Sequence, residues 1–239
     1  MPDEQEVLAT LVDKRRRVAR GDVLFHLGDE FRSLYAVRTG FFKSIVVGGD
    51  EQSQIGGFHL SGDILGFDGM AEGRYESEVR AMEDSEVCVI PYDGLSDLAI
   101  RFPPLQRQLH RLMSREIVRE RSVMLLLGSM QADQKVAVFL LGVAERYRRL
   151  GYSGTSFILR MTREEIGSYL GLKLETVSRH LSAFDQQGLI SIDKREVILK
   201  DLNALQRVAG SAIGAGSDAP ANRTEWLEFV KCSDHPELN

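Results

Sequence analysis

The sequence predicts an α+β protein: an N-terminal antiparallel β-roll, then one long helix, then a C-terminal winged helix-turn-helix. Three observations predict this order. Glycine-containing turns recur between residues 20 and 92, as in a sheet of short strands. Residues 105–131 contain no proline and no glycine except Gly128, which favours a single helix. Two further helical patterns then flank a short glycine turn.

Composition narrows the class of protein before any element is placed. The 239 residues are 43% hydrophobic and carry a net charge of -5, which suits a globular protein with a sizeable core. Apolar runs are shorter than the roughly 18 residues that a membrane helix needs, so we expect no membrane association. The two cysteines, Cys88 and Cys232, exclude a disulfide framework and favour a reducing cytoplasm.

The β-roll is predicted from turns spaced about as far apart as short strands require. Gly21-Asp22, Gly28-Asp29 and Ser61-Gly62-Asp63 separate short apolar or alternating runs. Glycine supplies the positive φ of such turns at little steric cost. The spacing therefore predicts a sandwich or barrel of antiparallel strands.

The long helix carries a stripe of residues at steps of three and four: Met113, Ile117, Glu120, Met124 and Leu127. Either the stripe packs against the β-roll, or it forms a two-helix seam between subunits. The arginines on the other faces favour the seam. Glu120 would then approach its own copy across the two-fold axis, and like charges oppose association. We hypothesise that Glu120 weakens the dimer, unless it turns sideways to Arg119 or Arg121 of the second copy.

The helix-turn-helix is predicted from its end signals. Thr162 and Glu165 fit a capping box, and Gly171 ends the short helix that follows. A second helix is expected from Leu174 to Gln187, and Gly188 closes it. Two helices joined by a glycine-containing turn of three or four residues form this unit.

The second helix has a buried and an exposed face. Val177, Leu181 and Phe184 are expected inside. The exposed residues could reach base edges in a major groove, because arginine donates to guanine and a carboxylate accepts from cytosine. A salt-bridged surface helix would also place Glu175 and Arg179 four residues apart. Residues 189–199 read as a hairpin, or wing, with a charged turn. The candidate DNA-binding residues are Lys173, Glu175, Thr176, Ser178, Arg179, Ser182, Lys194 and Arg195.

Several stretches resemble the superfamily of the cyclic-AMP receptor protein and the fumarate-nitrate reduction regulator, CRP/FNR. They include LYAVRTGFFKS, GFHLSGDILGFDGM, LMSREI, MLLLG and MTREEIGSYLGLKLETVSRHL. The resemblance implies a cupin-like sensor barrel, a dimerisation helix and a winged helix-turn-helix. The Glu-x-x-Ser-Arg motif of the FNR branch falls on Glu175, Ser178 and Arg179. Leu174 stands where the cyclic-AMP branch has an arginine, so the palindrome TTGAT-N4-ATCAA is expected rather than a TGTGA site.

The resemblance does not extend to the effectors of the family. The cyclic-nucleotide branch uses a glutamate for the ribose and an arginine for the phosphate; the positions here hold Phe67 and Glu76. Glu76 would repel a phosphate, so we expect no cyclic AMP. An oxygen-sensing [4Fe–4S] cluster needs four thiolates. Only Cys88 matches, three expected ligands are missing, and the sequence does not favour a cluster.

Other roles remain open for the sensor half. Cys88 is a possible redox sensor, although a buried strand thiol is the simpler interpretation. Haem could use His26, His59 or His110 as an axial ligand, and the protein could also act without a bound effector. No cofactor and no metal site are predicted.

The sequence thus predicts a regulator of transcription and not an enzyme, since it has no nucleophile–base pair and no phosphate loop. The expected partners are double-stranded DNA, a second copy of the chain and RNA polymerase. The predicted segments are a sensor domain at 1–103, a dimerisation helix at 104–131, a DNA-binding domain at 132–210 and a flexible C-terminal tail at 211–239.

Overall fold

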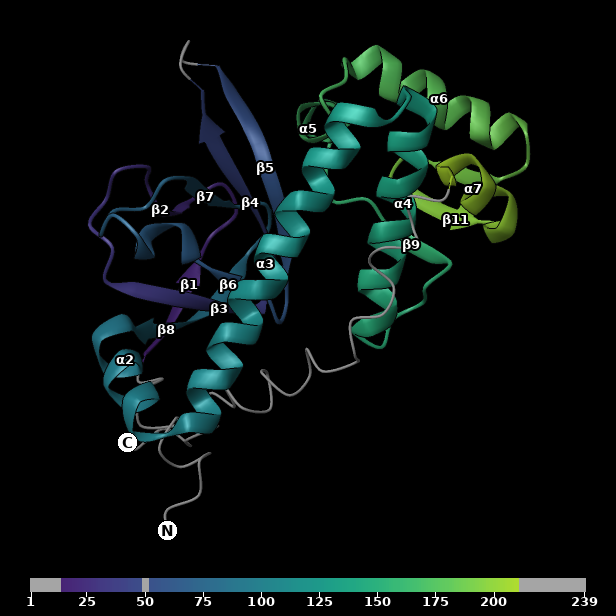
Figure 1. The fold of residues 1–239 in the computed structure, drawn as a ribbon. Coiled ribbons are helices and arrows are strands. Elements are labelled where there is room, and N and C mark those ends of the chain that lie inside the picture. The colour runs from purple at the N-terminus through teal and green to yellow at the C-terminus, as the bar shows by residue number, and fades with distance from the viewer. Residues whose placement is uncertain (1–13, 49–51, 211–239) are drawn as a thin grey trace, which may run out of the picture. The chain divides into compact units, whose positions relative to one another are not determined.

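The computed structural model describes residues 14–48 and 52–210, which form two compact units. Among these residues, the first unit runs to Arg115 and the second begins at Glu116. The division therefore lies inside the longest helix, α3 (Pro103–Ser129), which Figure 1 shows as one continuous helix. The tail predicted at 211–239, with Cys232, lies outside the described residues.

The described strands of the N-terminal unit form two four-stranded antiparallel sheets, ordered β1-β8-β3-β6 and β2-β7-β4-β5. This confirms the predicted β-roll. The strands are β1 (Lys14–Val18), β2 (Val23–Phe25), β3 (Ser33–Thr39), β4 (Phe41–Val47), β5 (Ser53–Leu60), β6 (Ile64–Leu65), β7 (Glu78–Ala81) and β8 (Ser85–Pro91), with a short 3-10 helix η1 (Phe67–Met70) after β6.

Strand β1 lies at the edge of its sheet and pairs only with β8 among the described strands. Its first four residues, Lys14 to Arg17, are basic and exposed, and its last residue, Val18, is buried. Charged side chains on an edge strand hinder pairing with another chain. The single apolar residue anchors the strand to the core.

A turn between β3 and β4 illustrates why glycine punctuates the unit. Gly40 has φ 98°, which L side chains rarely adopt. A Cβ on Gly40 would lie 2.0 Å from Ser85 Oγ, and that hydroxyl donates to the carbonyl of Glu83 and accepts from the amide of Phe41. Only glycine allows the three segments to meet at this corner.

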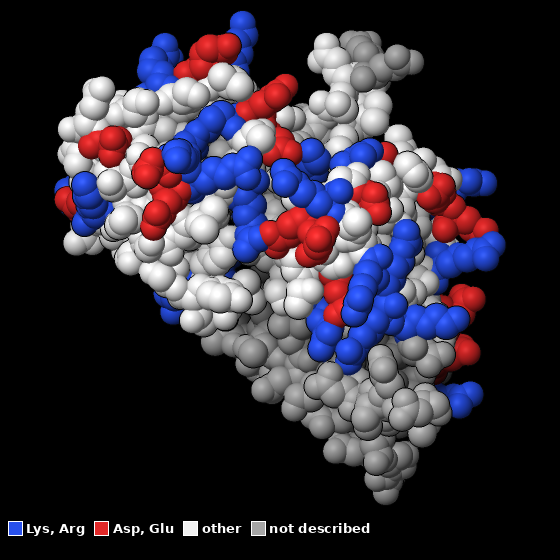
Figure 2. All heavy atoms as spheres, turned by 180° about the vertical axis from the view of Figure 1, so that it is seen from behind, with Lys and Arg blue, Asp and Glu red and all other residues white. Residues whose placement is uncertain are grey.

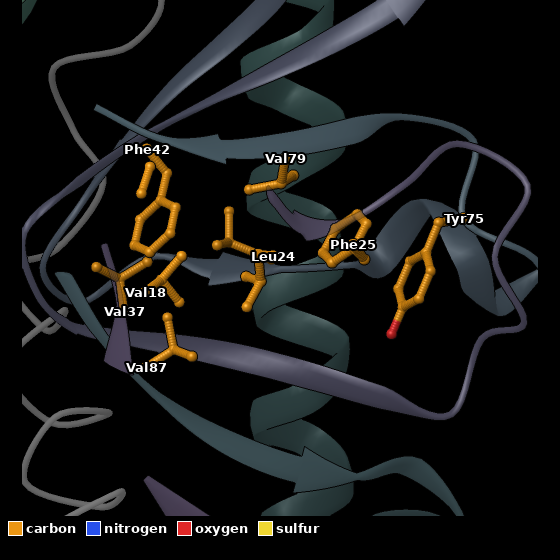
Figure 3. Packing of buried hydrophobic residues seen from close by; sticks show 10 residues of the cluster. Val18, Leu24, Phe25, Val37, Phe42, Tyr75, Val79 and Val87 are labelled. Carbon is orange, nitrogen blue, oxygen red and sulfur yellow. The ribbon is translucent and has the colours of Figure 1, made fainter. Parts of the chain in front are cut away.

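The N-terminal unit has two apolar cores. The first fills the β-roll with side chains from both sheets (Figure 3), among them Val18, Leu24, Phe25, Val37, Phe42, Tyr75, Val79 and Val87. The second lies on the other face of the β8–β3 pair, where Leu34, Cys88 and Ile90 pack against Leu95 and Leu105. Leu95 belongs to α2 (Tyr92–Arg101), a helix that the sequence analysis did not predict.

The helical region agrees with the prediction to within a few residues. Helix α3 runs from Pro103 to Ser129, where the sequence predicted a helix over 105–131, and α4 (Ala132–Arg149) follows it. No helix of the described residues is long and apolar enough to cross a membrane.

The second unit contains the predicted helix-turn-helix and wing. The two helices are α5 (Arg163–Leu170) and α6 (Leu174–Gln186), and the wing is the hairpin of β10 (Ile190–Asp193) and β11 (Glu196–Leu199). Two elements were not predicted: β9 (Ser156–Ile158), which adds a third strand beside β11, and α7 (Leu202–Ala209), which packs on α4.

Candidate nucleic-acid interface

The first helix of the unit begins at the predicted capping box. The amide of Glu165 donates to Thr162 Oγ1 at 3.1 Å, and the amide of Thr162 donates to Glu165 Oε2 at 2.7 Å. Two backbone donors at the start of α5 are thereby satisfied. Ile166 and Leu170 are buried, as predicted, so this short helix is fixed at its start and along its inner face.

The turn between α5 and α6 is fixed by two glycines. Gly171 ends α5 in the left-handed conformation at φ 63°. A Cβ on Gly167 would lie 2.5 Å from the carbonyl oxygen of Leu172, because the chain folds back closely on the helix. The amide of Leu172 donates to the carbonyl of Gly167 at 2.8 Å, which locks the turn. The angle between the two helices is therefore defined by backbone contacts.

Helix α6 has the two faces that the sequence predicted. Val177, Leu181 and Phe184 are buried, while Glu175 and Arg179 are exposed. Among the candidate residues, Lys173 and Ser182 are also exposed, and Thr176 and Ser178 are half-buried. The helix ends at Gln186, with Gly188 beyond it at φ 73°.

Glu175 and Arg179 form no ion pair within residues 14–48 and 52–210. The alternative interpretation, in which the two side chains stabilise the helix surface through a salt bridge, therefore lacks its expected contact. Both side chains leave their polar groups available to a ligand. An unpaired carboxylate and an unpaired guanidinium one helical turn apart suit the edges of a cytosine and a guanine.

The wing turn is held from two sides. Asp193 pairs with Glu196, so Lys194 and Arg195 form a two-residue turn, and both are exposed. Lys194 has φ 52°, which is unusual for a residue other than glycine. Arg163 donates from Nη2 to the carbonyl of Lys194 at 3.3 Å, and the amide of Leu159 donates to the carbonyl of Arg195 at 2.7 Å. These contacts fix the backbone of the wing tip, from which the two exposed basic side chains extend.

Arg163 also contributes to this surface, although the sequence did not predict it. It is the first residue of α5 and faces the wing. Burial lowers the pKa of its guanidinium and that of Arg160. The position of Arg163, directly after the N-cap, could have suggested a cation near the start of the helix-turn-helix, but its contact with the wing depends on the tertiary fold.

The charge of the second unit is balanced over its surface. Residues 160–207 contain eight Lys or Arg and seven Asp or Glu. Over the described chain as a whole, Figure 2 also shows basic and acidic side chains next to one another on the face that it draws. A nearly neutral domain binds phosphates through a few local cations, which gives a moderate dependence on salt.

The stripe predicted on α3 has three different environments. Ile117 and Met124 are 57% and 70% exposed in the single chain, and Glu120 is exposed beside them. Met113 packs against the second apolar core of the N-terminal unit. Leu127 is half-buried, and its Cδ2 lies 3.4 Å from where a Cβ on Gly171 would stand.

Two further apolar residues of α3 are exposed and were not in the predicted stripe. Val118 is 49% and Leu125 is 63% exposed. The stripe follows steps of three and four from Met113, and Val118 and Leu125 each come directly after one of its residues in the sequence. The exposed apolar surface of α3 is thus wider than the prediction and includes Ile117, Val118, Met124 and Leu125.

The residues at the positions expected to bind a cyclic nucleotide in the cyclic-nucleotide branch make different contacts in this structure. Ser77 is buried and donates from Oγ to Asp68 Oδ2 at 2.6 Å. Glu76 is exposed next to it, and Phe67 packs against an apolar core. Ser77 is thus hydrogen-bonded to the carboxylate of Asp68. The neighbouring Glu76 places a second carboxylate where the cyclic-nucleotide branch has a cation.

The candidate sensor residues are dispersed. Cys88 is 2% exposed in the second apolar core. His59 is buried with Nε2 3.0 Å from Ser44 Oγ, whereas His26 is exposed with Nδ1 3.2 Å from Glu78 Oε2. Within the part of the chain that the structure describes, no three His, Cys, Asp or Glu side chains come close enough to hold a metal ion.

Comparison with known domain families gives two matches. The cyclic nucleotide-binding domain family matches residues 15–102, and the Crp-like helix-turn-helix domain family matches residues 134–208. The two matches cover the β-roll and the unit that contains α5, α6 and the wing.

Two similar proteins cover most of the chain. The transcriptional regulatory protein btr of Bordetella pertussis is 49% identical over 208 residues, which is 87% of this chain and 86% of that protein. The fumarate and nitrate reduction regulatory protein of Escherichia coli is 38% identical over 207 residues, which is 87% of this chain and 83% of that protein.

A solved structure is also similar. FixK2 of Bradyrhizobium japonicum superposes with a TM-score of 0.73 at 31% sequence identity, over 82% of this chain and 96% of that one. The similarity covers both units of the chain and not the helix-turn-helix alone.

Proposed function

Because the chain belongs to the CRP/FNR family of DNA-binding transcriptional regulators, we propose that it binds the palindrome TTGAT-N4-ATCAA as a homodimer. One observation carries the proposal: α6 presents Glu175, Ser178 and Arg179 on one face, with the charged groups of Glu175 and Arg179 unpaired within the described residues. These are the residue types that read cytosine and guanine edges.

The residue before this motif supports the choice of palindrome. Leu174 is 43% exposed at the start of α6, where an arginine would add another base or phosphate contact. A leucine offers no hydrogen bond and suits the methyl group of a thymine. We therefore assign the protein to an FNR-type site and not to a TGTGA site.

A two-fold symmetric site is best read by a two-fold symmetric protein. The exposed apolar residues of α3 supply a surface on which a second copy could pack. We place Ile117, Met124 and Glu120 in that contact. The dimer would bring two copies of α6 to successive major grooves, in the cytoplasm where the DNA lies.

The effector of the regulator is not cyclic AMP in this proposal. The hydrogen bond from Ser77 to Asp68 occupies a hydroxyl that a phosphate would need, and Glu76 adds a second negative charge. The residues also do not fit a conventional iron–sulfur cluster, because Cys88 is buried and Cys232 is the only other cysteine of the sequence.

RNA polymerase is the expected second protein partner, since a regulator that binds promoter DNA acts through the polymerase. Whether the outcome is activation or repression depends on where the palindrome lies in the promoter. A transcription assay with purified polymerase, and with the palindrome at several distances from the start site, measures this outcome.

Equilibrium binding to fluorescent duplexes tests the proposal. We expect Arg179→Ala to lose about tenfold to a hundredfold in affinity for the palindrome, because one good bidentate base contact contributes ~1–3 kcal/mol. Discrimination at the contacted base pair should fall with it. Arg207→Ala is the matched control, because Arg207 is an exposed arginine of α7 in the same unit. Unchanged specificity in the Arg179 variant would refute the assignment of α6.

A further inference from the structure

Lys135 is the most buried lysine or arginine among the described residues, at 8% exposure. It lies in the first turns of α4, where the positive end of the helix dipole disfavours a cation. Burial of a charge is also costly unless the charge is paired or hydrogen-bonded. A lysine at this position therefore needs a specific acceptor.

The acceptor is the end of the preceding helix. Lys135 Nζ donates to the carbonyl oxygen of Leu127 at 3.0 Å. Leu127 is in the last turn of α3, whose final carbonyls have no partner within the helix and form the negative end of its dipole. The amine thus satisfies an acceptor of α3 and places its charge where that helix favours it.

The side chain of Leu127 reaches the helix-turn-helix. Its Cδ2 lies 3.4 Å from where a Cβ on Gly171 would stand, so the leucine side chain lies close to that glycine. Gly171 ends α5 and begins the turn that leads to α6. One residue of α3 thus contacts α4 through its carbonyl and the helix-turn-helix through its side chain.

We infer that Lys135 and Leu127 are positioning residues for DNA recognition, which fix the direction in which α5 and α6 extend from the end of α3. The inference rests on the proposed function. A dimer gains affinity on a palindrome only when both copies of α6 reach their half-sites together, and this gain depends on a fixed geometry. If the junction between the end of α3 and the helix-turn-helix is less rigid, binding to the whole palindrome should weaken. Binding to a single half-site should stay unchanged.

The test compares the full-length Lys135→Met variant with the unaltered full-length protein. The substitution preserves the bulk of the side chain and removes its charge. Affinities are measured for a single half-site and for palindromes with spacers of three, four and five base pairs. We expect the preference for the four-base-pair spacer to fall about fivefold or more, as expected for a typical coupling between sites, with half-site affinity unchanged. Lys135→Arg, which can still donate to the carbonyl, should restore the preference.

Lys14→Met is the matched control, because Lys14 is exposed in β1. Leu127→Ala is a second variant, which keeps the backbone carbonyl and removes the side chain that lies close to Gly171. It should also reduce the preference for the four-base-pair spacer. This variant decides the question if Lys135→Met does not fold. Sedimentation measures dimerisation for each protein.

Three results would overturn the inference: an unchanged spacer preference, an equal loss on half-site and palindrome, or a loss of dimerisation with the preference retained. An equal loss would mean that Lys135 stabilises the helix-turn-helix itself. Failure of the unaltered protein to prefer the four-base-pair palindrome would instead refute the proposed function, so the two failures are distinguishable.

Discussion

Arg163 shows how a single residue can serve two parts of the interface. Its guanidinium reaches the carbonyl of Lys194, so the start of α5 and the tip of the wing are joined. The strained turn at Lys194, with φ 52°, is thereby supported from outside the hairpin. Lys194 and Arg195 then remain directed away from the core, where a phosphate could approach them.

We predict that Arg163→Gln weakens binding to the palindrome about threefold to tenfold, in line with the ~1 kcal/mol of a typical hydrogen bond. The loss should be similar on all duplexes, because the contact orders the wing and reads no base. Titrations against matched and scrambled duplexes measure it, with Arg207→Gln as the control. A loss confined to the matched duplex would contradict this role.

At the scale of elements, α3 carries the contact proposed between copies. Glu120 is exposed next to Ile117 and Met124. The alternative is that Glu120 turns to Arg119 or Arg121 of the second copy. Arg119 Nη2 lies 3.1 Å from Glu116 Oε1 within the same helix, and Arg121 is exposed. We hypothesise that the two Glu120 side chains approach each other and weaken the dimer.

Removing the charge at Glu120 should therefore tighten the dimer. Glu120→Ala is expected to lower the dimer dissociation constant roughly fivefold, because two carboxylates near a protein surface repel by about 1 kcal/mol or more. Glu120→Gln, of the same size, should act in the same direction. Sedimentation measures the constant, and Glu164→Ala, an exposed carboxylate of α5, is the control. An unchanged constant would remove Glu120 from the contact.

The elements that the sequence predicted well are those with local end signals. The capping box at Thr162 and the turn at Gly171 involve neighbours in the chain, so they could be read directly. Strand β9 has only three residues and is defined by its pairing with β11, which lies far along the chain. No local sequence pattern reveals this pairing. Helix α2 starts without a side-chain cap and contains Gly94.

Helix α7 is a different kind of omission. The side chain of Asp201 accepts from the amide of Ala204 at 2.8 Å, which is a normal N-cap, and Gly210 ends the helix. These signals were available in the sequence. The exposed face of α6 was also predictable. The hydrogen bond from Arg163 to the carbonyl of Lys194 was not, because it joins residues that are distant in sequence.

On the scale of the whole molecule, the unit that matches the cyclic nucleotide-binding domain family has carboxylates where the sequence analysis expected no nucleotide to bind. Asp68, Ser77 and Glu76 make a polar corner with two carboxylates, and the β-roll interior is filled with apolar side chains (Figure 3).

Protein purified without oxygen should accordingly show neither the broad absorption of an iron–sulfur cluster nor the Soret band of haem, and iron and sulfide should be below stoichiometric amounts. The absorption spectrum and metal assay measure this directly. Stoichiometric iron and sulfide, or a Soret band, would contradict it. Cys88→Ser would then show whether the colour depends on that thiol.

Strand β1 also has a consequence for how the chain is made. It is the first described strand to leave the ribosome, yet its partner β8 is the last described strand of its unit to be synthesised. During that interval its edge has no partner, a state in which strands of nascent proteins aggregate. The run Lys14 to Arg17 repels similar strands on neighbouring nascent chains, so the feature that protects the finished sheet also protects the unfinished one.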